Sequence, residues 1–126
     1  MSTKAINITI SSLPMKATLN DSISAQKIWN ALPLRAQVNT WGEEIYFEIP
    51  VSQALESEFA REEVSLGDLG YWPEGRCFCI FFGKTPVSTD ESIRPASAVN
   101  VIGKITGDLA LLKKVRAGET VVLERI

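Results

Sequence analysis

One segment of the chain is apolar at every position of an expected strand. Residues 77–82 have the sequence CFCIFF, and side chains alternate between the two faces of a strand, so both faces here are apolar. A turn at Pro73, Glu74 and Gly75 precedes this strand, and a second turn region follows from Gly83. A strand of this kind must be covered on both sides. It therefore indicates a closed barrel with chain packed on its outside, or the middle of a layered sheet.

Alternation of apolar and polar positions predicts further strands. Residues 4–10 and 15–19 are expected to form a hairpin at the start of the chain. Residues 34–41 and 44–49 alternate in the same way around Gly42, which predicts a second hairpin with a polar outer face. Further strands are expected over residues 98–106 and 120–126, for a total of about eight.

Two segments have the spacing of an amphipathic helix. Apolar residues at i, i+3, i+4 and i+7 start at Ala25, after N-cap candidates at residues 20–22, and Pro33 ends the segment. Asp108 is the expected N-cap of a second helix, which ends at Gly118. Both helices are expected to pack an apolar face on the barrel.

These elements predict a single domain over residues 1–126 with a mainly β fold. The expected architecture is a closed antiparallel barrel of about eight strands with two capping α-helices. Two long loops, residues 51–65 and 83–97, are candidate walls of a binding site.

Composition narrows the choice of partners. The chain has a formal net charge of -2 and a pI near 5.2, which argues against nucleic acid and anionic membranes as partners. The first residues lack the long apolar core of a signal peptide, and no run of 18 apolar residues occurs. We therefore expect a cytoplasmic protein.

The chain contains no histidine. This excludes Ser-His and Cys-His nucleophile pairs and imidazole zinc sites. Cys77 and Cys79, the two cysteines, are expected on one strand face, too far apart for an unstrained disulfide, and are interpreted as buried thiols. We expect no metal and no organic cofactor.

Four segments carry a resemblance to a known family. NTWGEEIYF (residues 39–47), GDLGYWPEG (67–75), CIFFGKTP (79–86) and PASAVNVIGKI (95–105) closely resemble the small prokaryotic cyclophilin-like family. The similarity extends from about Leu34 to the C-terminus. It implies a single-domain cyclophilin-type barrel and assigns no activity.

A weaker similarity connects the chain with the true cyclophilins, which are peptidyl-prolyl isomerases. Phe82 is similar to their pocket phenylalanine, but their essential arginine would fall at Val38 or Asn39, where the chain has none. That arginine donates a hydrogen bond to the prolyl nitrogen. The hydrogen bond weakens the amide resonance that sets the barrier of about 20 kcal/mol to cis/trans rotation of the prolyl bond. Arg35 or Arg94 could replace it, which keeps isomerase activity as an alternative.

Aromatic and acidic residues of the second hairpin and of residues 67–75 are expected to meet at one rim of the barrel. Aromatic walls with a few polar groups are typical of ligand pockets. Packing of these side chains in the core is the competing interpretation. The predicted ligand-binding residues are Trp41, Glu43, Tyr46, Tyr71, Trp72 and Phe82.

Glu43 and Glu44 are adjacent carboxylates near this rim. Neighbours on a strand face opposite ways, which disfavours a two-carboxylate hydrolytic mechanism. Glu43 alone is the expected rim charge, suited to orienting an amine or amide. Asp68 is interpreted as a turn former, and Thr85 and Asn100 are expected to satisfy backbone groups.

The function expected from these features is binding of a small molecule or a peptide segment in a shallow aromatic groove. One alternative is the prolyl isomerase named above. Another is an interaction module without a pocket, since related barrels occur within amide-hydrolysing assemblies; this would expose a flat apolar patch. The oligomeric state, the ligand and any catalytic residue are not predicted.

Overall fold

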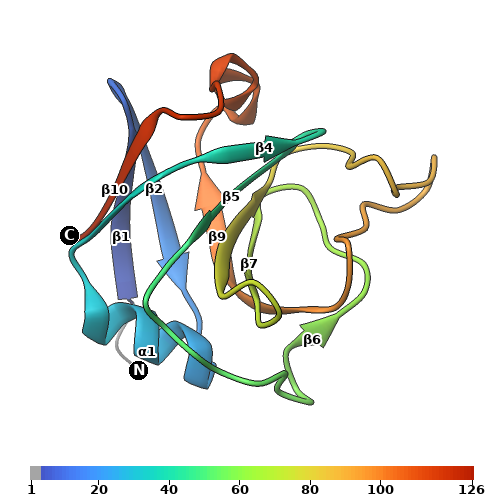
Figure 1. The fold of residues 1–126 in the computed structure, drawn as a ribbon, viewed down its shortest axis with the longest axis horizontal. Helices are drawn as coiled ribbons and strands as arrows, with labels where there is room; N and C mark the ends of the chain where they lie inside the picture. Colours follow the sequence, from blue (N-terminus) through green and yellow to red (C-terminus); the bar gives the residue numbers. More distant parts are fainter. Residues whose placement is uncertain (1–3) are drawn as a thin grey trace.

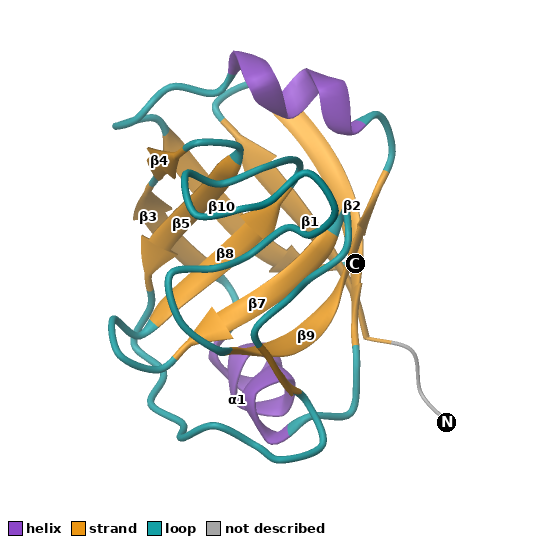
Figure 2. Ribbon diagram, turned by 90° about the vertical axis from the view of Figure 1, so that its right-hand side faces the viewer, coloured by secondary structure: helices purple, strands orange, loops and turns teal. Residues whose placement is uncertain are grey.

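The structure, a computed structural model, describes residues 4–126. It is a nearly closed antiparallel β-barrel with a helix at each end (Figure 1, Figure 2). The strands in chain order are β1 (Lys4–Ile10), β2 (Leu13–Leu19), β3 (Leu34–Gln37), β4 (Asn39–Trp41), β5 (Glu44–Glu48), β6 (Ala60–Arg61), β7 (Asp68–Trp72), β8 (Cys77–Phe81), β9 (Val99–Thr106) and β10 (Thr120–Arg125). The helices are α1 (Ile23–Ala31) and the 3-10 helix η1 (Leu109–Lys114).

One stretch of chain brings the two edges of the sheet together. The strand order is β3-β10-β1-β2-β9-β7-β8-β5-β4, so β3 and β4 are the outermost strands, although only Val38 separates them in the chain. The N–H of Val38 donates to the carbonyl of Glu119, and its own carbonyl accepts from Gly118. Residues 34–41 thus pair with β10 at one end and with β5 at the other, which nearly closes the barrel.

The barrel interior holds the main apolar core. Ile6, Ile8 and Ile10 of β1 are fully buried, as their alternation predicted. The rings of Phe47 and Phe78 stack with their centroids 5.1 Å apart. The apolar faces of β1, β5 and β8 therefore meet inside the barrel, and the apolar area they remove from water is the main stabilising contribution.

The strand that is apolar on both faces is covered on both faces, as predicted. Phe78 and Ile80 belong to the interior core, whereas Cys77, Cys79 and Phe81 form a second apolar cluster on the outer face of the barrel. Parts of the two long loops pack onto this second cluster through Val64 and Ile93, which are joined by an isolated β-bridge. The outer face of β8 is therefore a small core of its own.

The first long loop is anchored to the start of α1. The carboxylate of Glu56 accepts hydrogen bonds from the backbone N–H groups of Ile23 and Ser24 and from the hydroxyl of Ser24. Anions are stabilised at a helix N-terminus by the orphan N–H groups and the helix dipole. Asn100 adds a second anchor, accepting from the N–H of Glu56 and donating to the carbonyl of Ala54.

The expectation of two capping α-helices is wrong. The α1 helix forms as predicted, with Ser22 as its N-cap, but residues 109–114 form a 3-10 helix. The segment is short because Gly107 and Gly118 both have positive φ and the N–H of Gly118 is bound to Val38. A tight 3-10 turn fits such a short connection. Neither helix of residues 4–126 is long and apolar enough to cross a membrane.

Candidate functional site

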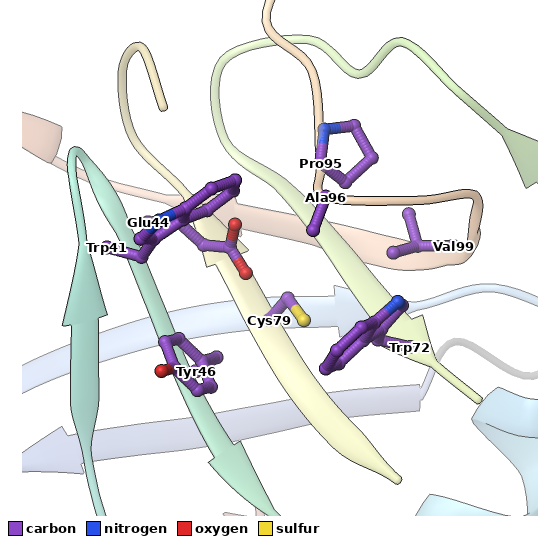
Figure 3. A pocket seen from close by; sticks show the side chains of 8 residues that line it. All are labelled: Trp41, Glu44, Tyr46, Trp72, Cys79, Pro95, Ala96 and Val99. Carbon is purple, nitrogen blue, oxygen red and sulfur yellow. The ribbon is translucent and has the colours of Figure 1, made fainter. Parts of the chain in front are cut away.

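A cavity of about 170 Å³ lies on the outer face of the barrel, over β5 and β8. Its walls come from β4, β5, β7, β8, the start of β9 and the loop that precedes β9 (Figure 3). The lining residues are Trp41, Glu44, Tyr46, Trp72, Cys79, Pro95, Ala96 and Val99. The three aromatic residues are only half-buried, so solvent reaches the cavity.

The position of Glu44 and Tyr46 in the cavity follows from strand register. Both lie on the outer face of β5, because Ile45 and Phe47 between and after them point into the core. Tyr46 is paired with Cys79 of β8, which forms the floor between the aromatic walls. The indole N–H of Trp72 donates to the hydroxyl of Ser97 at 2.7 Å and thereby fixes its ring at the opposite wall.

Glu44 is the buried carboxylate of the cavity. It is 6% exposed, and its Oε1 atom has no hydrogen-bond partner among the described residues. Figure 3 shows its carboxylate between Trp41 and Cys79, pointing toward the middle of the ring of lining side chains. Burial raises the pKa of Glu44 from 4.5 to about 7, and the Cys79 thiol opposes this rise through a hydrogen bond. The carboxyl group therefore changes charge near neutral pH.

The cysteines beside Glu44 are not nucleophiles. Cys79 is buried, and burial, followed by the charge of Glu44, raises its pKa well above the usual value. Burial likewise raises the pKa of Cys77. Both side chains remain neutral thiols, as the sequence predicted, because a thiolate would need a nearby cation or helix N-terminus.

The structure brings three of the predicted ligand-binding residues to the cavity: Trp41, Tyr46 and Trp72. Tyr71 and Phe82 lie elsewhere, in the interior core. Tyr71 is fully buried, and its hydroxyl donates to the carbonyl of Val51. Neighbours on a strand face opposite sides, so Tyr71 cannot share the outer face with Trp72.

Glu43 also lies away from the cavity lining. Its carboxylate forms an ion pair with Lys113 of η1 at 3.6 Å and contacts the backbone of Gly83. The lining carboxylate is that of the neighbouring residue Glu44, which is not among the predicted ligand-binding residues. The available signal was register: Glu44 and Tyr46 share one face of β5, two residues apart.

The two arginines that could replace the cyclophilin arginine do not line the cavity. Arg35 is exposed on β3, which pairs with β10. The guanidinium of Arg94 is bound by the carboxylate of Glu63 at 2.8 Å and by the hydroxyl of Ser92. Neither is placed to donate a hydrogen bond inside the cavity.

Other predicted polar residues have structural partners. Asp68 accepts from the N–H of Ser65 at 2.7 Å and forms an ion pair with Lys104, in keeping with a turn former. The hydroxyl of Thr85 donates to the carbonyl of Arg94. Within residues 4–126, no three acidic, cysteine or histidine side chains lie close enough together to hold a metal ion.

Comparison with known proteins identifies one family, which covers nearly all of the chain. A family model described as Cyclophilin-like matches residues 4–124. The solution structure of a hypothetical protein from Archaeoglobus fulgidus is 41% identical, with a TM-score of 0.81 over 98% of this chain and 95% of that one. No curated protein matches. The barrel, the motifs and the family match agree, and the chain belongs to the cyclophilin-like family.

Proposed function

We propose that this protein binds a small molecule, or one side chain of a peptide segment, in the cavity over β5 and β8. The observation that carries the proposal is an unpartnered carboxylate oxygen of Glu44 in a cavity walled by Trp41, Tyr46 and Trp72. A buried polar atom without a partner costs free energy, and a bound donor would remove that cost. Aromatic walls supply most of the binding energy in pockets of this kind.

The size of the cavity limits the ligand. About 170 Å³ accommodates a small head group or a side chain but not a drug-sized molecule, which fills several hundred cubic ångströms. The part of the ligand that enters is therefore compact, with an apolar surface against the rings and one hydrogen-bond donor or one cationic group toward Glu44.

The test is a thermal-shift screen against small metabolites and short peptides, because a ligand held by the folded state alone raises the melting temperature. Hits are then titrated into Trp41→Ala and Trp72→Ala, which we expect to lose binding while keeping their fold. Trp29→Phe is the matched control, since Trp29 lies under Arg125, outside the cavity lining. Equal binding by the wild type and both alanine variants would refute the proposal.

The interaction module without a pocket has less support. Its flat apolar patch would need exposed apolar side chains grouped on one surface. The exposed apolar side chains are dispersed instead. Ile23 and Leu55 lie at one surface depression, Val87 lies at a second and Leu111 at a third. We therefore prefer the cavity as the functional site.

A further inference from the structure

Glu44 lacks a counter-cation within the protein. Six ion pairs join side chains of residues 4–126, and Glu44 takes part in none of them. The lining of the cavity includes neither lysine nor arginine. A buried carboxylate that stays unpaired is destabilising in its charged form. A positively charged ligand would supply the missing partner.

The walls suit a cation as well. The face of an aromatic ring carries negative electrostatic potential, and tryptophan attracts cations most strongly. Trp41 and Trp72 stand on opposite sides of the Glu44 carboxylate, and Tyr46 completes the wall beside Cys79 (Figure 3). Three aromatic side chains around one carboxylate form the kind of cage that recognises alkylated ammonium groups.

The supply of hydrogen-bond acceptors favours a methylated cation over a primary ammonium. The indole of Trp72 is a donor only, and its N–H is already bound to Ser97, while the sulfur of Cys79 is a weak acceptor. The hydroxyl of Tyr46 points away from the carboxylate in Figure 3. Glu44 is left as the principal side-chain acceptor. A primary ammonium carries three N–H donors, more than this lining can accept, whereas a dimethylammonium group carries one and a trimethylammonium group none.

We propose that the cavity recognises a small methylated ammonium group, with Trp41, Tyr46 and Trp72 as its cage and the Glu44 carboxylate as its counter-ion. This inference rests on the proposed function, because it names the ligand class of the same site. The group could belong to a free metabolite or to a methylated lysine side chain, and the two sources share this chemistry.

The experiment compares the binding of a cation with the binding of an uncharged molecule of the same shape. Choline and 3,3-dimethyl-1-butanol have the same shape, but the second has carbon in place of the charged nitrogen. Binding is measured by two-dimensional NMR titration of the intact protein, with the indole N–H signals of Trp41 and Trp72 as reporters. We expect saturable binding of choline and at least tenfold weaker binding of the butanol. Free trimethyllysine and a trimethyllysine peptide distinguish the two sources.

The Glu44→Gln variant tests the counter-ion. We expect it to bind choline at least tenfold more weakly and to leave the affinity for 3,3-dimethyl-1-butanol within twofold of wild type. Glu48→Gln is the matched control on the same strand, because Glu48 is exposed and pairs with Arg76 outside the cavity. It should leave both affinities unchanged.

The pH dependence of binding provides an independent readout. Tyr46 and Cys79 line the cavity together with Glu44, and Cys77 lies beside Cys79 on the outer face of β8. The charged side chains of the surrounding strands and loop form ion pairs outside the lining: Glu48 with Arg76, Arg94 with Glu63, Asp68 with Lys104 and Lys84 with Asp90. Tyr71 is in the interior core and Glu91 is exposed. Burial raises the pKa of both cysteines, so they stay neutral. The pKa of Glu44 is about 7, so the carboxylate fraction falls and choline should bind about 30-fold more weakly at pH 5.5 than well above pH 7. Glu44→Gln should abolish this dependence.

The possible results separate the two proposals. Equal binding of choline and 3,3-dimethyl-1-butanol, or unchanged choline binding by Glu44→Gln, would overturn the cation assignment while leaving a cavity that binds neutral ligands. Absence of binding by every probe at millimolar concentration would overturn the cation assignment as well. Failure of the proposed function itself requires that the metabolite and peptide screen also gives no ligand that depends on Trp41 and Trp72.

Discussion

The indole ring of Trp72 lies so close to the backbone of Gly75 that a Cβ atom at Gly75 would stand 2.7 Å from Cζ3 of the ring. Glycine at this position of the turn between β7 and β8 leaves the space that the ring occupies. On its other side, the same ring is held by the hydrogen bond to Ser97 and forms one wall of the cavity. The turn residue therefore contributes to the shape of the site.

Gly75→Ala should move the ring of Trp72. Because the added methyl group overlaps the indole, we expect a loss of about 1–3 kcal/mol in the free energy of unfolding. The indole N–H signal of Trp72 should shift in NMR spectra as its bond to Ser97 is disturbed. Glu74→Ala, at an exposed position of the same turn, is the control. An unchanged melting temperature together with an unchanged Trp72 signal would show that the contact does not constrain the ring.

Glu44→Gln should change how stability depends on pH. The pKa of Glu44 rises from 4.5 to about 7 in the folded protein because the side chain is buried. The folded state then binds the proton more tightly than the unfolded state, so this group favours folding fully below about pH 4.5 and loses that contribution as pH rises to about 7. The loss is roughly 3 kcal/mol.

Urea unfolding of wild type and Glu44→Gln at pH 5 and pH 8 measures this effect. The difference in unfolding free energy between the two pH values should be smaller in Glu44→Gln than in wild type. The unfolding free energy of the variant minus that of wild type should therefore be larger at pH 8 than at pH 5. Parallel pH profiles for the two proteins would contradict the burial of an ionisable Glu44.

Glu56→Gln should destabilise the anchor between the first long loop and α1. The side chain loses its negative charge and one of its acceptor oxygens at the helix N-terminus, which we expect to cost about 1–2 kcal/mol. Burial raises the pKa of Glu56, but the hydrogen bonds from Ser24 and Ile23 outweigh burial and lower it overall. This stabilisation is therefore present above the unfolded pKa and is lost as pH falls through the folded value.

The measurement is denaturant unfolding at pH 7 and at pH 3. The free energy of unfolding of Glu56→Gln should be lower than that of wild type at pH 7, and the difference should be smaller at pH 3, since protonation of the wild-type carboxylate increases as pH falls. Glu58→Gln, an exposed glutamate of the same loop, serves as the control and should match wild type throughout. A Glu56→Gln variant as stable as wild type at pH 7 would rule out the anchor.

Prolyl isomerisation should not be accelerated by this protein. Catalysis needs a donor to the prolyl nitrogen, and Arg94 is occupied by Glu63 while Arg35 lies on β3, away from the cavity. A protease-coupled assay with a proline-containing peptide should give the uncatalysed rate at micromolar protein. Acceleration that disappears in Arg94→Lys would instead assign a catalytic role to that arginine.

Local patterns predicted most of the elements. Ile6, Ile8 and Ile10 identified β1 by alternation alone, and Ser22 with Pro33 bounded α1. The 3-10 form of residues 109–114 was missed, since Asp108 and the following apolar spacing suit either type of helix. In the structure the segment lies between Gly107 and Gly118, which both have positive φ, and the N–H of Gly118 is bound to the carbonyl of Val38.

Only part of the candidate site could be predicted from the sequence. Its aromatic composition was visible in the sequence, and Trp41, Tyr46 and Trp72 do meet at the cavity. The sequence did not show which of two adjacent residues faces outward. The predicted set therefore includes Tyr71 beside Trp72, and Glu43 instead of Glu44. Register errors of one residue exchange the faces of a strand completely.

The residues from Cys77 to Phe82 are apolar at every position, so both faces of their strand must be buried, because burial of apolar surface is favourable. Local sequence does not specify which segments cover the outer face, nor which part of that face stays open to solvent. The packing of two distant loops against β8 leaves one gap, and the carboxylate of Glu44 lies in it because pairing with β8 fixes the register of β5. Such long-range pairing depends on the whole chain and is not encoded in any local pattern.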